Sequence, residues 1–333
     1  MKVTVIGSGS WGSAFSRLLS RKGHDVQVLT LTRAEAGELN ASHVNAHFLP
    51  DVSLPEQIRF VGMDDADIAG AELIVYVVPT QAVRPVARWV AARGVGDALQ
   101  LSLAKGLELG TLKRPTEIIA EETGRPAAAL SGPNHAEEVS LDMPSATVIA
   151  DDDEQRARAL QAAITCDSFR VYASSDLLGV EFCGAAKNPV AIAVGISDGL
   201  GFGDNTRASL VTRSLAEMTR LGGVLGARGE TFAGLAGIGD LFATCTSRHS
   251  RNRRAGELLA RGTPPAQVEA LVGQTVEGIP TCYALRDLGI KFGIEMPVTE
   301  NVYAVIELGR PARECVAHLM GREPKTEFGG AGQ

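Results

Sequence analysis

GSGSWG, residues 7–12, follows the apolar run Val3–Ile6 and precedes the helical pattern Ser13–Arg21. Glycines spaced G-x-G-x-x-G between a strand and a helix are typical of a loop that holds the diphosphate of a dinucleotide. Gly7 permits the tight turn, Gly9 lets the backbone approach a diphosphate, and Gly12 lets the helix pack on the strand. The context therefore predicts a dinucleotide site, with a glycine-rich turn that serves packing alone as the alternative.

Short β-branched runs alternate with amphipathic helical patterns as far as residue 175, which is typical of a Rossmann-type, mostly parallel sheet covered by helices. We predict strands at residues 3–6, 26–29, 58–61, 73–78, 99–104, 127–130, 146–150 and 169–172. The run at 73–78 is apolar without alternation, as expected for a strand covered on both faces.

The pattern changes after Ser174, where convincing strands end and long helical patterns begin. Helices are predicted at residues 180–196, 206–221, 253–259 and 297–308, and the glycine clusters 199–203 and 234–239 are predicted to be loops. We expect an α/β dinucleotide-binding domain at 1–175, an all-helical substrate domain at 176–328 and a disordered tail at 329–333. Pro189 is expected near a helix start or at a kink.

Length, charge and cysteine content exclude several classes of protein. A chain of 333 residues is long enough for two domains, and 32 basic against 39 acidic residues give a net charge of −7, which disfavours a general nucleic-acid binder. Five scattered cysteines without CxxC spacing argue against a zinc site or a disulfide framework, so we expect no metal and a reducing cytoplasm. We also expect no signal peptide and no membrane span, since no apolar run approaches about 18 residues.

The end of the second predicted strand bears on the choice of cofactor. Residues 30–33 read Thr-Leu-Thr-Arg and contain no carboxylate that would bind an adenosine ribose and repel a 2′-phosphate. Arg33 could pair with that phosphate, which slightly favours NADP(H) over NAD(H). The alternative for Arg33 is a solvated surface side chain.

Polar groups follow two predicted strands at the sheet edge where open α/β sheets bind ligands. Lys105 comes directly after the strand at 99–104, and Gly132 and Asn134 follow the strand at 127–130. In the apolar pattern 184–195, Lys187 and Asn188 are the polar interruptions. A buried ammonium is unfavourable unless it faces a cleft, where desolvation makes it a usable acid or base, or unless it reaches solvent.

A glycine turn and a basic run follow in the helical part. Asp240 stands after two glycines, and Ser250, Arg251 and Asn252 belong to a run, 247–254, that holds four arginines. Arginine forks with serine and asparagine donors can surround a phosphate, although such a run alone is more often a solvated helix face.

Taken together, these blocks resemble the bacterial-type NAD(P)-dependent glycerol-3-phosphate dehydrogenase family over nearly the whole chain. The resemblance rests on the blocks GSGSWG, SLAKGLE (102–108), SGPNHAEE (131–138), the stretch 184–210, GIGDLFATCTSRHSRNRR (237–254) and VEG (276–278). It implies reversible reduction of dihydroxyacetone phosphate to sn-glycerol 3-phosphate for glycerophospholipid synthesis in a cytoplasmic enzyme, and it suggests a homodimer.

The resemblance also implies roles for single residues. Lys187 would transfer the proton, with Lys105 and Asp240 as further catalytic residues. Substrate contacts would come from Lys105, Gly132, Asn134, Lys187, Asn188, Asp240, Ser250, Arg251 and Asn252. Cofactor contacts would come from Gly7, Gly9, Ser10, Trp11, Gly12, Arg33, Lys105, Ala136, Arg251, Thr275 and Glu277.

This sequence departs from the family pattern at Asn134, where Ser or Thr is usual, at Leu31, where Arg or His often reads the adenosine phosphate, and at Pro189. Leu31 cannot bind a phosphate, so the choice between NAD and NADP stays open. Two alternative functions also remain: a related dehydrogenase for a phosphorylated sugar acid or β-hydroxyacid, and a non-catalytic NADPH sensor or scaffold.

Overall fold

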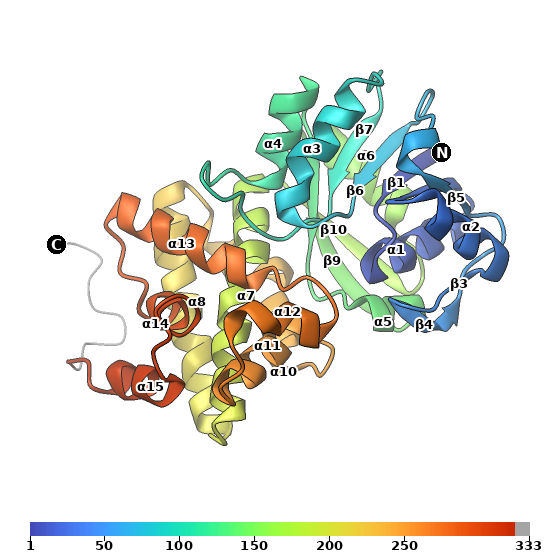
Figure 1. Ribbon diagram of the computed structural model, residues 1–333. Coiled ribbons are helices and arrows are strands. Elements are labelled where there is room, and N and C mark those ends of the chain that lie inside the picture. Colours follow the sequence, from blue (N-terminus) through green and yellow to red (C-terminus); the bar gives the residue numbers. More distant parts are fainter. Residues whose placement is uncertain (324–333) are drawn as a thin grey trace.

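The computed structural model describes residues 1–323, so the expected disordered tail 329–333 lies outside the described residues. It contains an eight-stranded sheet with helices on both faces, followed by a helical region (Figure 1). The sheet order is β10-β9-β8-β7-β6-β1-β2-β5, and every neighbouring pair is parallel except β8 and β9. The predicted fold class is confirmed.

All eight predicted strands are present, with shifted ends. They are β1 (Lys2–Ile6), β2 (Asp25–Thr30), β5 (Arg59–Gly62), β6 (Leu73–Tyr76), β7 (Leu99–Ser102), β8 (Ala128–Ser131), β9 (Ser145–Ala150) and β10 (Phe169–Ser174). The four residues of β6 are all buried, as the run without alternation predicted. A short antiparallel hairpin, β3 (Val44–Asn45) and β4 (Leu49–Ser53), was not predicted.

Alternate residues of the strands point to two separate cores. Val75 of β6 packs with Phe15 and Leu19 of α1 (Ser10–Arg21), whereas Ile74 packs with the opposite helices. The helices of this region are α1, α2 (Arg33–Ser42), α3 (Thr80–Ala91), α4 (Pro115–Thr123), α5 (Ala136–Ser140) and α6 (Glu154–Ile164), with the short turn η1 (Met63–Asp65). The sheet is therefore covered on both faces, and its strand ends meet the helical region.

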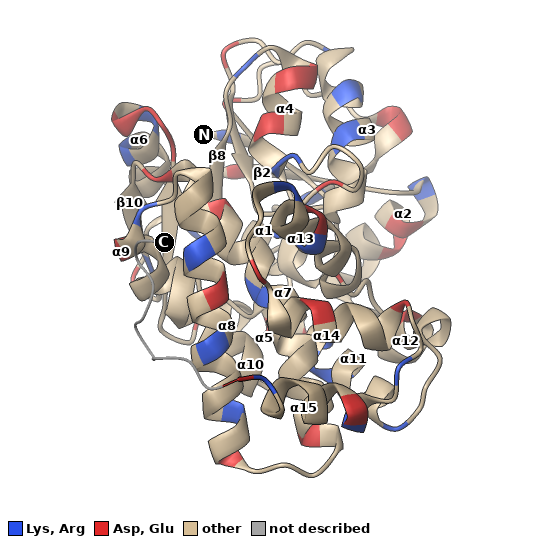
Figure 2. Cartoon of the chain, turned by 90° about the vertical axis from the view of Figure 1, so that its left-hand side faces the viewer, with Lys and Arg blue, Asp and Glu red and all other residues tan. Residues whose placement is uncertain are grey.

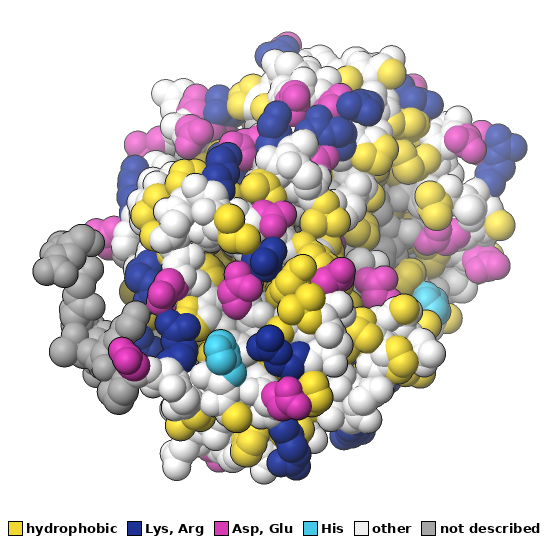
Figure 3. Space-filling model, turned by 60° about the vertical axis from the view of Figure 1, so that its left-hand side comes forward, with side chains coloured by type: hydrophobic (Ala, Val, Ile, Leu, Met, Phe, Trp, Pro, Cys, Tyr) yellow, Lys and Arg dark blue, Asp and Glu magenta, His cyan; other side chains and the backbone are white. Residues whose placement is uncertain are grey.

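Charged residues join neighbouring helices on one face. Arg84 of α3 binds Glu108 at 2.7 Å and Glu122 of α4 at 2.5 Å, and Arg88 binds Glu122 at 2.8 Å. Figure 2 shows these basic and acidic segments on α3 and α4. On the face of the molecule in Figure 3, acidic, basic and hydrophobic side chains are interspersed.

The helical region is built around α7 (Leu177–Gly199). Its other helices are α8 (Asp204–Leu225), α9 (Gly229–Ala233), α10 (Asp240–Thr246), α11 (Arg251–Ala260), α12 (Pro265–Val272), α13 (Gly278–Phe292), α14 (Pro297–Ile306) and α15 (Ala312–Met320). Sequence patterns predicted α7, α8, α11 and α14 and missed the others. The glycine cluster 199–203 joins α7 to α8 as predicted, but the cluster 234–239 contains a wide helical turn, η2 (Leu235–Gly239), with a kink at Gly237. A Cβ atom on Gly237 would lie 2.2 Å from the carbonyl oxygen of Phe232.

Helix α7 bears on two expectations, the absence of a membrane span and the position of Pro189. By length and composition it qualifies as a membrane-spanning helix, but 94% of its apolar window is buried within the protein, so it is the core of the helical region. Pro189 lies in the interior of α7, twelve residues after the helix begins, so the expected position near a helix start is wrong and the expected kink stays a prediction.

Two glycines bring α7 into backbone contact with α11. A Cβ atom on Gly195 would lie 1.9 Å from the carbonyl oxygen of Arg253, and one on Gly256 would lie 2.1 Å from that of Ile192. The two helices can approach this closely only because both positions lack a side chain. This contact sets the position of Lys187 and Asn188 relative to the first turn of α11.

Candidate active site between the sheet and the central helix

The glycine loop has the geometry that its sequence predicted. Gly7 has a φ of 115°, and a Cβ atom there would lie 2.4 Å from the carbonyl oxygen of Val77. A Cβ atom on Gly12 would lie 2.0 Å from the oxygen of Gly7, whereas Gly9 faces open space. Gly9 is also the N-cap of α1 and provides no side-chain cap, so the first-turn amides of this helix remain available to a diphosphate.

A buried ion pair joins α7 to α10. Lys187 Nζ donates to Asp240 Oδ1 at 2.8 Å and to Thr244 Oγ1 at 2.5 Å. Lys187 and Asp240 are both buried, with relative exposures of 6% and 3%. Thr244 was not predicted, although it follows Asp240 by four residues and so lies on the same face of α10.

Lys105 approaches the same carboxylate from the sheet. Its Nζ donates to Asp240 Oδ2 at 2.8 Å, to the carbonyl oxygen of Gly132 at 3.0 Å and to Asn134 Oδ1 at 3.0 Å. The amide of Asn134 is held by Thr147, to whose hydroxyl it donates at 3.1 Å. The residues that follow β7 and β8 therefore meet the helical region at one carboxylate.

The charges of this cluster depend on one another. Burial disfavours charge on Asp240, but the nearby ammonium groups of Lys105 and Lys187 outweigh it and hold the pKa of the carboxyl below its ordinary value. Burial lowers the pKa of Lys105 to about 8, with a smaller contribution from Lys187, while Asp240 opposes the shift. Two lysines beside one carboxylate give the cluster a net positive charge below that pH, which suits an anionic ligand.

The side-chain amides of Asn188 and Asn252 form a hydrogen-bonded chain beside the Lys105–Asp240–Lys187 cluster. Asn188 Nδ2 donates to the carbonyl oxygen of Lys105 at 2.8 Å, and Asn252 Nδ2 donates to Asn188 Oδ1 at 3.0 Å. Asn252 Oδ1 accepts from the amide of Gly278 at 2.9 Å, and the neighbouring Glu277 accepts from the amide of Thr80 at 2.8 Å. These bonds fix both asparagines and join the sheet region to three helices.

The basic run contributes fewer free arginines than its sequence suggests. Arg253 binds Asp198 at 2.7 Å and Glu257 at 2.9 Å, and Arg254 donates to the carbonyl oxygen of Leu271. Ser250 caps α11, since its hydroxyl accepts from the amide of Arg253. Arg251 donates one bond, of 3.2 Å, to the oxygen of Thr275 and keeps the rest of its guanidinium accessible.

The structure places the predicted cofactor residues Arg33, Trp11 and Ser10 differently. The Arg33 guanidinium pairs with Asp65, which raises its pKa, and the arginine side chain is 78% exposed. The ring of Trp11 lies 5.6 Å from that of Phe15, and Trp11 packs with Ala136 in a small apolar cluster. Ser10 begins α1, where its backbone amide remains in place for a diphosphate.

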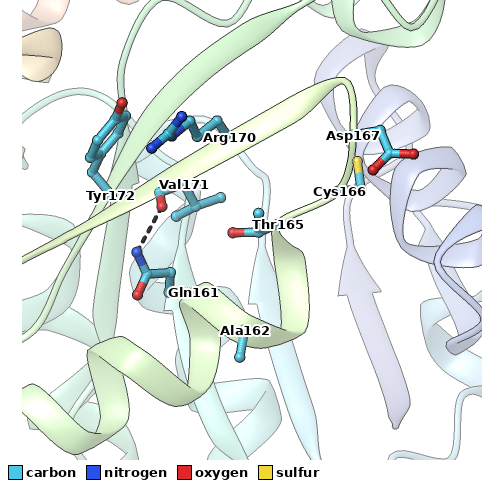
Figure 4. A pocket seen from close by; sticks show the side chains of 8 residues that line it. All are labelled: Gln161, Ala162, Thr165, Cys166, Asp167, Arg170, Val171 and Tyr172. Atoms are coloured by element: carbon cyan, nitrogen blue, oxygen red, sulfur yellow. Dashed lines mark hydrogen bonds between the residues drawn. The ribbon is translucent and has the colours of Figure 1, made fainter.

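Two hollows lie outside this cluster. One, of about 480 Å³, has a lining that includes Pro133 and Phe242 together with His135 and His249, whose rings lie 6.2 Å apart. The other, of about 540 Å³, lies beside α6 and β10 and contains none of the predicted site residues (Figure 4). Among residues 1–323 no group of three or more His, Cys, Asp or Glu side chains could hold a metal ion.

Comparison with known proteins gives one consistent result. A family model described as the NAD-dependent glycerol-3-phosphate dehydrogenase N-terminus matches residues 2–157, and the corresponding C-terminus model matches residues 176–317. The chain is 45% identical to a glycerol-3-phosphate dehydrogenase [NAD(P)+] of Pelotomaculum thermopropionicum, over 98% of this chain and 95% of that protein. It is 44% identical to one of Shouchella clausii, over 98% and 97%.

Solved structures agree with the sequence comparisons. A glycerol-3-phosphate dehydrogenase from Coxiella burnetii superposes with a TM-score of 0.92 at 37% identity, over 96% of this chain and 99% of that one. A ketopantoate reductase from Ralstonia eutropha reaches a TM-score of 0.64 at 16% identity, which shows a shared fold and nothing more.

Proposed function

This chain belongs to the NAD-dependent glycerol-3-phosphate dehydrogenase family and reduces dihydroxyacetone phosphate to sn-glycerol 3-phosphate with NAD(P)H, and we propose that Lys187, Lys105 and Asp240 form its catalytic centre. The observation that carries the proposal is the shared carboxylate of Asp240, which holds one lysine on each oxygen at 2.8 Å. The names of the relatives give the reaction, and this geometry supports the roles that we propose for the three residues.

The glycine loop fits a dinucleotide, because Gly9 faces open space and α1 begins without a side-chain cap. We propose that Gly7, Gly9, Ser10 and Gly12 hold the diphosphate, with Lys105, Ala136, Arg251, Thr275 and Glu277 toward the nicotinamide. The bound cofactor supplies a hydride to the carbonyl carbon of the substrate.

The two lysines differ in how many donors they have left. An ammonium group has three N–H donors. Lys105 uses all three, on Gly132, Asn134 and Asp240, whereas Lys187 uses two, on Asp240 and Thr244. Lys187 therefore keeps one hydrogen for a substrate oxygen, and Lys105 holds Asp240 and the strand-end loop in position.

We assign the proton transfer to Lys187 on this ground. When hydride adds to the carbonyl carbon, the C=O π pair moves to oxygen, and Lys187 gives that oxygen the proton that completes the hydroxyl group. Asp240 and Thr244 each accept one hydrogen of the ammonium group and so direct two of its hydrogens away from the substrate. Such a positioned acid typically contributes about 10² to 10⁴-fold to the rate.

The phosphate end of the substrate is assigned to Arg251. Its guanidinium offers five N–H donors, of which one is used on Thr275. Asn252 follows Arg251 in α11 and donates to Asn188, which is the neighbour of Lys187 in α7. We therefore propose that Arg251 binds the phosphate end of the three-carbon substrate and Lys187 the carbonyl end. Ser250, Asn188 and Gly132 complete the proposed pocket.

The test follows absorbance at 340 nm with dihydroxyacetone phosphate and either NADH or NADPH. Oxidation of at least one cofactor, with little or none when a β-keto acid replaces the substrate, and no reduction of NAD+ or NADP+ by a phosphorylated sugar acid, supports the proposal. Cofactor binding without turnover would favour the sensor alternative, and turnover of only the acids would favour the related dehydrogenases.

We propose that the enzyme works in the cytoplasm as a homodimer. All five cysteines are free thiols and four are buried, which supports a reducing compartment such as the cytoplasm. We expect a homodimer from the family resemblance, and light scattering during size-exclusion chromatography tests it. We further propose that the product supplies glycerophospholipid synthesis.

A further inference from the structure

We propose that Glu35 makes the cofactor site selective for NAD(H) over NADP(H). The proposal rests on the proposed function, since it concerns the adenosine end of the same dinucleotide site. Glu35 lies in the first turn of α2, two residues beyond the stretch 30–33 in which an acid was sought. The contacts of its side chain show why this position matters for binding the adenosine ribose.

The Glu35 carboxylate joins the glycine loop to the end of β2. Its Oε1 accepts a short hydrogen bond from the hydroxyl of Ser8, inside the loop, and its Oε2 accepts from the amide of Leu31 at 3.3 Å. In a dinucleotide-binding sheet, the adenosine ribose lies between these two segments, and an acid there binds its hydroxyls. Glu35 therefore supplies that acid from a helix and not from the strand end.

The local backbone holds Glu35 in this position. Thr32 is the N-cap of α2, and its hydroxyl accepts from the amide of Glu35 at 3.2 Å, which fixes the first turn of the helix. Ser8, the partner of the carboxylate, is buried. The side chain is thus aimed back at the loop, whereas an unconstrained glutamate on a helix surface would point into solvent.

No basic side chain among residues 1–323 is paired with the Glu35 carboxylate. Arg33, the residue that could pair with a 2′-phosphate, donates from Nε and Nη2 to the two oxygens of Asp65, and Asp64 stands beside them. Leu31 is 80% exposed and has no polar side-chain atom. Within residues 1–323, no Lys, Arg or His side chain forms an ion pair with Glu35.

These charges act differently on the two cofactors. The 2′-hydroxyl of NAD(H) can donate a hydrogen bond to a Glu35 oxygen, replacing that of Ser8 or Leu31. The 2′-phosphate of NADP(H) is dianionic near pH 8, has no hydrogen to donate, and would face a carboxylate at hydrogen-bond distance. Repulsion at such a distance is worth at least a tenfold difference in affinity. The carboxylate of Glu35 and the pairing of Arg33 with Asp65 thus weaken both grounds on which positions 30–33 favoured NADP(H).

Isothermal titration calorimetry tests the assignment without turnover, using ADP-ribose and 2′-phospho-ADP-ribose with the full-length protein at pH 8. We expect the wild-type protein to bind ADP-ribose at least about tenfold more tightly. In Glu35→Gln, which keeps the shape and removes the charge, that ratio should fall at least about tenfold, mainly because the phosphorylated ligand binds better. Glu38→Gln is the control, since it removes an exposed carboxylate one turn further along α2.

The outcomes distinguish failure of the role proposed for Glu35 from failure of the proposed dinucleotide site. A wild-type protein that binds both ligands equally, or the phosphorylated ligand more tightly, would overturn the role of Glu35 and leave the proposed function intact. An unchanged ratio in Glu35→Gln, or an equal change in Glu38→Gln, would also overturn it. Failure to bind either ligand would overturn the dinucleotide site itself, and with it the proposed function.

Discussion

Asp240 Oδ1 accepts a hydrogen bond from Lys187 Nζ at 2.8 Å, and both side chains are buried where the central helix meets the sheet. A buried ammonium is stable only with such a partner, because desolvation otherwise neutralises it. Asp240 also binds Lys105, so removal of either lysine leaves the carboxylate with one counterion. The catalytic roles of the lysines can therefore be tested without leaving a buried charge unpaired.

Lys187→Ala should lower turnover by about 10²-fold or more, since it removes the proposed proton donor. The affinity for NADH should stay within about twofold, because Lys187 contacts α10 and not the glycine loop. The rate of NADH oxidation and the Kd for NADH measure the two effects. Lys291→Ala, at the exposed end of α13, serves as the control. Near-normal turnover in Lys187→Ala would remove this lysine from the chemistry.

The pH dependence should identify Lys105. Burial lowers its pKa to about 8, so its positive charge is present below that pH and lost above it. We expect kcat/KM for dihydroxyacetone phosphate to fall as pH rises through about 8, because the anionic substrate then meets a less positive site. Asp240 raises the pKa of Lys105, so Asp240→Asn should move this limb to lower pH.

Lys105→Arg is the matched control for the pH profile, because a guanidinium keeps its charge throughout the accessible range. The limb near pH 8 should be absent in this variant, even if its maximal kcat/KM is lower. A limb that persists at the same pH in Lys105→Arg would assign the titration to another group.

The sheet was predictable because a parallel strand that is buried on both faces consists of consecutive apolar residues. Residues 73–76 are buried on both faces and carry no polar side chain other than the Tyr76 hydroxyl. The hairpin β3–β4 was missed because β3 has two residues and β4 contains Pro50 and Asp51, neither of which favours a strand. Small helices such as α9 and α10 were missed because they have only five and seven residues and follow glycine-rich turns, so neither shows a helical period.

The candidate site was predictable in its residue types but not in its pairings. Lys187 was noticeable as a charge in an apolar helix, yet Asp240 follows it by 53 residues, and only the fold shows that they meet. The same applies to Arg33 and Asp65, which are 32 residues apart. Local spacing therefore finds single chemical groups, whereas long-range contacts decide which of them remain free for a ligand.

Arg251→Ala should raise the KM for dihydroxyacetone phosphate by about 10- to 10²-fold, since a hydrogen bond to a charged group contributes about 1.5 to 3 kcal/mol. Arg254→Ala is the control from the same helix, because Arg254 is exposed and bonds only to Leu271 in the described structure. Steady-state kinetics at saturating NADH measure the effect. An unchanged KM for substrate with a raised KM for NADH would place Arg251 at the cofactor instead.

The contact between Gly195 and Arg253 should be essential to both stability and substrate binding. A Cβ atom at position 195 would lie 1.9 Å from a backbone oxygen that cannot move away without shifting α11. Gly195→Ala should lower the free energy of unfolding by about 1 to 3 kcal/mol or more, measured by urea denaturation. Because α11 begins with Arg251, the folded variant should also show a raised KM for dihydroxyacetone phosphate.

Gly223→Ala provides the matched comparison, because this glycine also lies inside a helix, α8, but nothing is within 4 Å of its added Cβ atom. Alanine favours a helix over glycine by about 0.5 to 1 kcal/mol, so this variant should be as stable as the wild type or more stable. If both variants lost the same free energy of unfolding, the close contact between Gly195 and Arg253 would not be the cause of the loss in Gly195→Ala. A loss confined to Gly195→Ala, accompanied by weaker substrate binding, ties the position of Arg251 to the backbone contact between α7 and α11.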